Sequence, residues 1–290
     1  MTHARLGFSA ATLPEVAGEL WLTVAPDGGR TRPVKTEGHG VLRLMRPLYL
    51  DDTGQLTYVI VNPGGAYFGE DYRIKADLAP GSALLLASQG ATRIYRTPER
   101  PAVQDSEYLL EDGSRLEYIS EQTIAYRDAE YHQNTRVTAA ETATGYFDEI
   151  VTPGWSPDDT PFSYAGMRLR TEVRAEDGRL VCLDNLHIRP RQIGHAIDGI
   201  GYLEGSSHMG SALILGPHTL GGYVDAIRAV VDGHDLERAG VTSGSRHGVS
   251  WVMVRALANS TDALRALLTD VNQWDRSTTT GQGRLDLRRY

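Results

Sequence analysis

Two adjacent carboxylates, Glu70 and Asp71, stand where a glycine-rich turn runs into a strand, in the segment GGAYFGEDYRI (residues 64–74). The residues that follow alternate between apolar and charged side chains, which is the pattern of a half-buried strand. Paired carboxylates at such a place suit three roles: general acid and base catalysis, binding of a hard or borderline metal ion, or acceptance of hydrogen bonds from turn amides. These residues alone leave all three alternatives open.

Five other acids interrupt apolar stretches of the chain. They are Asp148 and Glu149 in GYFDEIVTPGW, Glu117 and Glu121 in LEYISEQTI, and Glu172 in RTEV. An unpaired charge is costly in apolar surroundings, so each acid needs a partner or a function. Two interpretations follow: the acids bind turn amides and arginines, or they form a polar path through an apolar body.

The standard catalytic signatures are missing from the sequence. It contains no G-x-S-x-G, no G-x-x-x-x-G-K-[ST] and no H-E-x-x-H. The single cysteine, Cys182, excludes a zinc site built from several thiolates. The nine histidines are scattered singly, and none has the spacing of a metal site. Asp184 and His187 are predicted to face opposite sides of a strand, which disfavours them as a pair.

Composition narrows the class of protein further. The 290 residues carry a formal net charge of −8, which argues against nucleic acid as the main partner. No apolar run approaches the roughly 18–20 residues that a membrane-spanning helix needs, and the first residues lack the pattern of a secretory leader. A single cysteine suits a reducing compartment. We therefore expect a soluble cytoplasmic protein.

Short strands joined by tight turns are predicted over most of the chain, from about residue 16 to 190. Hairpins are expected at the Asp-Gly steps, where glycine supplies the positive φ that tight turns require. Residues 167–173 alternate so that the apolar side chains and Thr171 face one way and the charged ones the other. Strands at this even spacing predict a mainly β fold, either a sandwich or a layered, helix-like stack.

The C-terminal part changes its apolar period from 2 to 3.6, which predicts two principal helices near 219–232 and 260–274. Thr219 and Ser260 are the expected N-caps. A strand lies between the helices, so we expect an α-β-β-α part over about 215–290, attached to a β-rich body over about 16–212. Together they are predicted to form one unit over 1–290.

Several segments resemble the UreD family of urease accessory proteins, also called UreH. They are GGAYFGEDYRIKADLAPGSALLLASQGATRIYRTPERPAVQ, GSRLEYISEQTIAY, DEIVTPGWSPDDTPFSYAGMRLRTEV, GIGYLEGSSHMGS and the final GRLDLRRY. The resemblance covers about residues 18–290, and the residues in the segments TPGW and EGSSHMGS are similar to those of the Gram-positive branch. Many members have Gly-Gly-Asp where this chain has Gly69-Glu70-Asp71, so Asp71 is the matching acid.

The resemblance implies a non-enzymatic scaffold with a β-rich, helix-like fold and an internal tunnel. It implies binding to the urease structural subunits as apo-urease, to UreF and, through UreF, to the GTPase UreG, for delivery of Ni²⁺. No tightly bound cofactor is implied, only transient Ni²⁺, and no nucleic acid or membrane partner. The acids expected to line or flank the nickel passage are Asp71, Asp148, Glu149 and Glu172. The alternatives are a metal-dependent hydrolase using paired carboxylates and a generic β-rich binding module.

Overall fold

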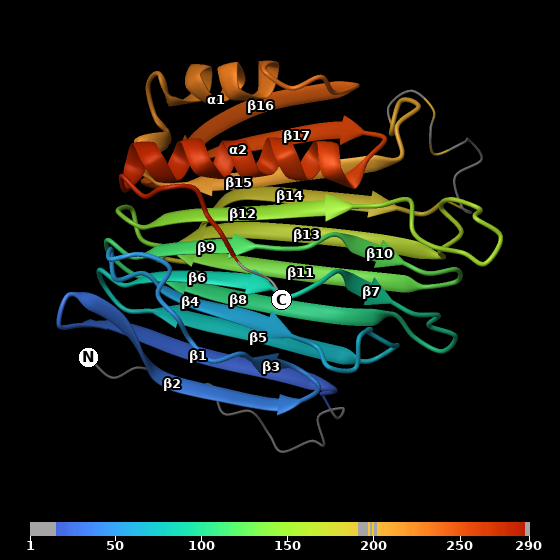
Figure 1. Ribbon diagram of the computed structural model, residues 1–290, viewed down its shortest axis with the longest axis horizontal. Helices are drawn as coiled ribbons and strands as arrows, with labels where there is room; N and C mark the ends of the chain where they lie inside the picture. Colours follow the sequence, from blue (N-terminus) through green and yellow to red (C-terminus); the bar gives the residue numbers. More distant parts are fainter. Residues whose placement is uncertain (1–15, 191–196, 198, 200–201, 288–290) are drawn as a thin grey trace.

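Two β-sheets packed face to face make up most of the molecule, and two helices cover the outer face of one of them (Figure 1). The computed structural model describes residues 16–190, 197, 199 and 202–287. Strands far outnumber helices in this part of the chain, as the alternating pattern predicted.

The sheets are mixed and long. Sheet A has the order β14 (Leu180–Ile188), β13 (Gly166–Ala175), β11 (Glu130–Ala139), β8 (Ala102–Leu110), β5 (Asp71–Leu78), β1 (Gly18–Asp27), β2 (Arg30–Gly40). Sheet B has the order β16 (Arg238–Arg246), β17 (Val249–Ala258), β15 (His208–Leu215), β12 (Thr144–Val151), β9 (Arg115–Ile119), β6 (Ala83–Ser88), β4 (Leu56–Val61), β3 (Arg43–Leu44). The short strands β7 (Thr92–Ile94) and β10 (Thr123–Ala125) attach to sheet B beside β12.

From β4 to β13 the chain passes back and forth between the sheets. Each new strand therefore lies beside the previous strand of the same sheet, and the chain forms stacked coils. Neighbours within each sheet are therefore parallel: β5, β8, β11 and β13 in sheet A, and β4, β6, β9 and β12 in sheet B. Antiparallel hairpins, β1–β2, β13–β14 and β16–β17, lie on either side of this stack. The helix-like stack of strands, predicted alongside a sandwich, is thus confirmed.

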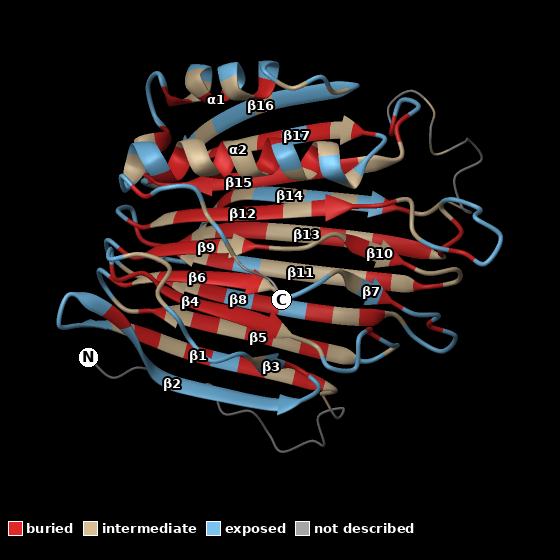
Figure 2. Cartoon of the chain, viewed as in Figure 1, coloured by how far each residue is buried: buried red, intermediate tan, exposed pale blue. Residues whose placement is uncertain are grey.

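The inner faces of the two sheets form the larger core. Alternate residues of each strand point into it, and Figure 2 shows the resulting bands of buried residues. Tyrosines are prominent there: the rings of Tyr67 and Tyr72 stack with centroids 3.9 Å apart, and Tyr108 packs between Tyr118 and Phe147. Burial of so many hydroxyl-bearing rings makes this core more polar than an aliphatic one.

A second core lies between sheet B and the two helices, α1 (Tyr223–Asp232) and α2 (Thr261–Thr279). The predicted apolar stripe of the second helix packs here through Leu264, Leu268 and Val271. Ser260 caps this helix as predicted, because its hydroxyl accepts hydrogen bonds from the amides of the first turn.

The start of the first helix differs from its prediction. Thr219 does not cap it: this residue ends a short 3₁₀ turn (Pro217–Thr219), and the helix begins after Gly222. Leu220 is 56% exposed, since the two glycines after it separate it from the helical stripe. Among the described residues, no helix is both long enough and apolar enough to span a membrane.

Candidate functional site

Asp71 opens strand β5 at the edge of the glycine-rich turn. Its carboxylate accepts a hydrogen bond from Arg100 Nη1 at 3.1 Å, and Arg100 Nε donates to the carbonyl of Gly69 at 2.8 Å. A side chain at Gly69 would not fit, because its Cβ would lie 2.5 Å from the carbonyl oxygen of Arg100. Glu70 turns the other way and accepts a hydrogen bond from the Tyr72 hydroxyl at 3.1 Å. The two acids of the opening motif therefore have separate partners.

Asp148 lies on the face of β12 that α2 covers. Its carboxylate accepts hydrogen bonds from the Ser120 amide at 2.7 Å and from Arg265 Nη1 at 3.0 Å. Burial raises the pKa of Asp148 to about 6, although the charge of Arg265 and the bonds from Ser120 act to lower it. The acid thus ties strand β12 to helix α2.

Glu149, the next residue, points the opposite way into the space between the sheets. It accepts a hydrogen bond from Gln133 Nε2 at 2.7 Å, and it lines a small cavity of about 50 Å³ together with Gln104, Tyr118 and Asp184. Burial raises the pKa of Glu149 to about 7; the hydrogen bond from Gln133 acts to lower it, and the nearby charges of Asp184 and Asp148 add to the rise.

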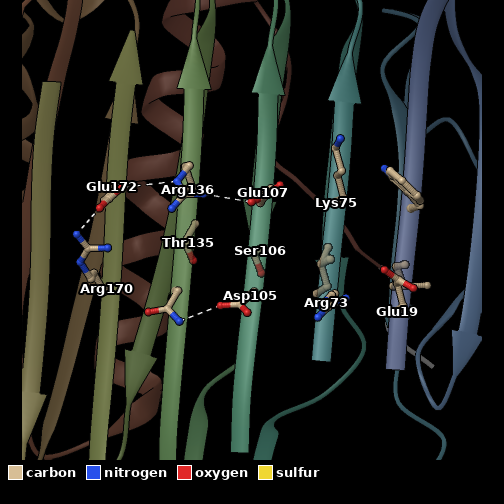
Figure 3. A pocket seen from close by; sticks show the side chains of 14 residues that line it. Glu19, Arg73, Lys75, Asp105, Ser106, Glu107, Thr135, Arg136, Arg170 and Glu172 are labelled. Carbon is tan, nitrogen blue, oxygen red and sulfur yellow. Dashed lines mark hydrogen bonds and ion pairs between the residues drawn. The ribbon is translucent and has the colours of Figure 1, made fainter. Parts of the chain in front are cut away.

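Glu172 lies on the outer face of sheet A, away from that cavity. Figure 3 shows it among the charged side chains of a shallow pocket of about 560 Å³. It pairs with Arg174 at 3.0 Å, with Arg136 at 3.6 Å, and closely with Arg170. Burial acts to raise the pKa of this carboxyl, but the bonds and charges of Arg174 and Arg170 outweigh it, so the pKa lies below its usual value. Glu172 is thus fully compensated by arginines.

The four predicted acids therefore occupy four environments. Asp148 and Glu149 are adjacent in sequence but separated by the sheet, while Asp71 and Glu172 lie elsewhere on sheet A. Of the four, Glu149 is bonded only to a neutral side chain among the described residues. In that part of the chain no group of three or more histidine, cysteine, aspartate and glutamate side chains is placed to hold a metal ion. The described residues therefore offer no metal centre for the alternative interpretation, a metal-dependent hydrolase that uses paired carboxylates.

The structure also contains a buried ionic cluster that the sequence did not reveal. Glu117 on β9 is fully buried and accepts hydrogen bonds from Arg115 Nε at 3.0 Å and from Arg276 Nη1 at 2.6 Å. Arg115 also donates to Asp275 at 3.0 Å. Two arginines and two acids thus join strand β9 to helix α2. One feature of the sequence could have indicated this cluster: the polar residues Asn272 and Asp275 continue the face of the helix that carries the apolar stripe.

The comparison with known proteins decides the family. The family model described as "UreD urease accessory protein" matches residues 16–289. This chain belongs to the UreD family. UreD proteins named "Urease accessory protein UreD" from Arthrobacter sp. (strain FB24) and Actinomyces naeslundii are each 42% identical to it, over 94% of this chain and 94% and 98% of theirs. The UreD of Staphylococcus epidermidis is 32% identical over 90% of this chain and 93% of its own length.

Membership of the UreD family confirms the resemblance drawn from the sequence motifs, including its Gram-positive character, since the relatives include actinobacterial chains. It also supports an accessory role in urease maturation rather than an enzymatic one. The motif that carried the resemblance, GGAYFGEDYRI, forms the turn and first residues of β5 around Asp71.

Proposed function

We propose that this UreD-family chain is a scaffold for urease maturation in the cytoplasm, which binds apo-urease and recruits UreF and, through it, the GTPase UreG. Ni²⁺ is the cargo of this assembly, and it reaches the dinickel site of urease through the interior of the scaffold. The observation that carries the proposal is the family match over residues 16–289.

We further propose that Glu149 is the main contact of the passing ion. A carboxylate paired with arginine offers little to a cation, and Asp71, Asp148 and Glu172 all have such a partner. Glu149 instead faces Gln133 inside the cavity between the sheets. Because its pKa is about 7, the group gives up a proton readily when a cation arrives and takes one back when the cation leaves.

Weak binding fits a transit role. One carboxylate with amide and hydroxyl neighbours supplies oxygen ligands without imidazole or thiolate groups, which hold nickel more tightly. Gln104 and Gln133 add neutral oxygens along the same cavity. Asp71, Asp148 and Glu172 then serve as flanking groups that position the strands around the passage.

The test is expression of the urease gene cluster with and without this chain. Urease activity and the nickel content of the purified urease are measured in both cases. The proposal predicts that both quantities fall together when the chain is absent and are restored when it is supplied. Full activity and full nickel content without the chain would contradict the proposal.

A further inference from the structure

The cavity that contains Glu149 shares part of its wall with a cavity at the surface. The inner cavity of about 50 Å³ and a surface cavity of about 570 Å³ are both lined by Asp184 of β14 and Met253 of β17. These two strands lie toward the end of the molecule that carries the helices (Figure 1). Asp184 and Met253 therefore separate the interior of the protein from its surface at this end.

The strand register brings Asp184 and Arg255 together from opposite sheets. Asp184 is paired with Thr171 of β13, and Arg255 of β17 is paired with Ser211 of β15. Thr171 and Ser211 both line the inner cavity. Because residues paired across antiparallel strands point to the same face of a sheet, Asp184 approaches this cavity from sheet A and Arg255 approaches it from sheet B.

An ion pair joins these two side chains across the mouth of the inner cavity. Arg255 Nη2 donates hydrogen bonds to both carboxylate oxygens of Asp184, each at 2.6 Å. The side chains of Arg255 and Asp184 remain 43% and 29% exposed. Ion pairs that are open to solvent contribute little to stability. This pair can therefore open at small cost and without leaving a charge buried.

The closed ion pair is unfavourable for a cation. The guanidinium group of Arg255 repels a divalent ion and occupies the oxygens of Asp184. Both charges act on the inner cavity: burial is the main cause of the raised pKa of Glu149, while the charge of Asp184 acts to raise this pKa and that of Arg255 acts to lower it. Once Arg255 moves away, two carboxylates, Glu149 and Asp184, line the same cavity with oxygens free to bind a cation.

A third cavity adjoins the inner one at a different place. It has a volume of about 370 Å³ and shares Thr92 of β7 with the inner cavity. Its lining residues, all in the described part of the chain, are neutral apart from Arg93. Of the two junctions between cavities, the one at Thr92 thus offers a hydroxyl group and the one at Asp184 a carboxylate. The junction at Asp184 is the one where charge can control the passage of a cation.

We propose that the Asp184–Arg255 pair is the gate of the nickel passage. In the closed state Arg255 covers Asp184 and keeps the ion at Glu149. In the open state Asp184 takes the ion from Glu149 and passes it over Met253 to the surface cavity. Asp184 is then a second carboxylate contact of the ion, and Arg255 is a positioning residue that controls access to it. The inference rests on the proposed function, because it takes Ni²⁺ as the cargo.

The test measures the initial rate at which nickel enters apo-urease in purified complexes of apo-urease, this chain and the accessory proteins, at a limiting Ni²⁺ concentration. Arg255→Gln frees Asp184 and removes the repelling charge, so we expect the rate to rise by up to about fivefold, the most that an exposed ion pair accounts for. Asp184→Asn keeps an oxygen for Arg255 and keeps the positive charge, but it removes the carboxylate, so the rate should fall at least about tenfold. Arg255→Lys retains the charge and should stay within about twofold of the wild type.

Opposite effects of two variants distinguish a gate from a structural tie. Arg255→Gln and Asp184→Asn weaken the same ion pair, so a merely structural role predicts that both lower the rate and the stability alike. Arg255→Gln alone already separates the two roles, since only a gate predicts a faster rate. The control is Arg32→Gln, because Arg32 forms an exposed pair with Asp27 at 2.8 Å in the distant β1–β2 hairpin and its loss should leave the rate unchanged. Urea unfolding and recovery of the complex are measured for every variant.

The outcomes also separate this inference from the proposed function. An Arg255→Gln complex that is no faster than the wild type overturns the inference alone, and so does an Asp184→Asn complex that is as fast as the wild type. In both cases the wild-type complex still loads urease with nickel. A wild-type complex that delivers no nickel to apo-urease overturns the proposed function and this inference with it.

Discussion

Removing the charge of Glu117 should destabilise the protein more than any surface substitution. Its carboxylate is fully buried and holds Arg115 and Arg276, with further hydrogen bonds from Gln55 at 2.9 Å and Asn272 at 3.3 Å. In Glu117→Gln, Arg115 keeps Asp275 as a charged partner, and Arg276 keeps only the longer contact with Asp51 at 3.8 Å. The new side-chain amide would also point its N–H groups toward the N–H groups of Arg115 and Arg276.

The magnitude follows from leaving a buried charge unmatched. Removing one partner of a buried ion pair costs about 3–5 kcal/mol, which is a large share of the roughly 5–15 kcal/mol that stabilises a typical protein. Arg276→Met should cost a similar amount, because it leaves Glu117 with Arg115 alone. The double variant removes one charge of each sign, so its loss should be smaller than the sum of the two by about 2 kcal/mol.

Urea unfolding at neutral pH, followed by circular dichroism, measures all three free energies of unfolding. The control is Glu107→Gln, whose carboxylate is 56% exposed and pairs with Arg136 at 3.2 Å, so that its loss should stay below about 1 kcal/mol. If Glu117→Gln costs no more than this control, or if the two changes add without coupling, the buried cluster does not lock α2 to the sheet as argued.

Three other predictions concern acids and exposed rings. The folded-state pKa of Glu149 is raised to about 7, so the contribution of this group to stability is full below the unfolded pKa near 4.5 and is lost as the pH rises to about 7. Between pH 5 and 8 the Glu149→Gln variant should therefore lose less stability than the wild type, by up to roughly 3 kcal/mol in urea titrations. Equal dependence of stability on pH in the two proteins would contradict this. Asp71→Asn should leave the nickel content of urease nearly unchanged and cost about 1 kcal/mol of stability, because Asp71 pairs with Arg100 and flanks the passage without contacting the ion; a fall in nickel content while the complex with the urease assembly is still recovered would contradict this and give Asp71 a role in transit. The isolated chain should self-associate at high concentration through exposed apolar side chains such as Phe68 and Trp155, which are 46% and 48% exposed, and light scattering should show that Trp155→Ser reduces this; a monomer at every concentration would argue against it.

Local patterns made the elements predictable, and long-range pairing made the site hard to predict. The hairpins at Asp27-Gly28 and Asp177-Gly178 and the stripe of α2 depend on residues a few positions apart, so the sequence alone sufficed for them. The hairpin predicted at Asp112-Gly113 was wrong, because this turn carries the chain from β8 in sheet A to β9 in sheet B. The opposite facing of Asp148 and Glu149 also follows from the strand period alone. The partners of Asp148 and Glu117 do not follow, because Arg265 and Arg276 reach them from a helix more than a hundred residues further along the chain.

The position of Glu172 on the outer face of sheet A, buried under arginines, is equally a matter of register. Its strand turns Thr171 toward the cavity between the sheets and Val173 into the core, so the acid must face outward, where Arg136 from the neighbouring strand meets it. The sequence pattern of a polar residue between apolar ones is the same whether the polar side chain points into a cavity or into a cluster of arginines. Only the pairing of β11 with β13 separates the two cases.

The attachment of α2 to β9 also sets an order for biosynthesis. Glu117 leaves the ribosome long before Arg276, and until the helix is made the acid has Arg115 but not its second cation. The stacked strands can pair one after another as they emerge. Until the last helix is made, however, sheet B keeps an exposed apolar face, and the Glu117 carboxylate lacks one of its two arginine partners. Nascent chains halted before α2 should therefore need a chaperone, and release of the finished chain coincides with closure of its second core.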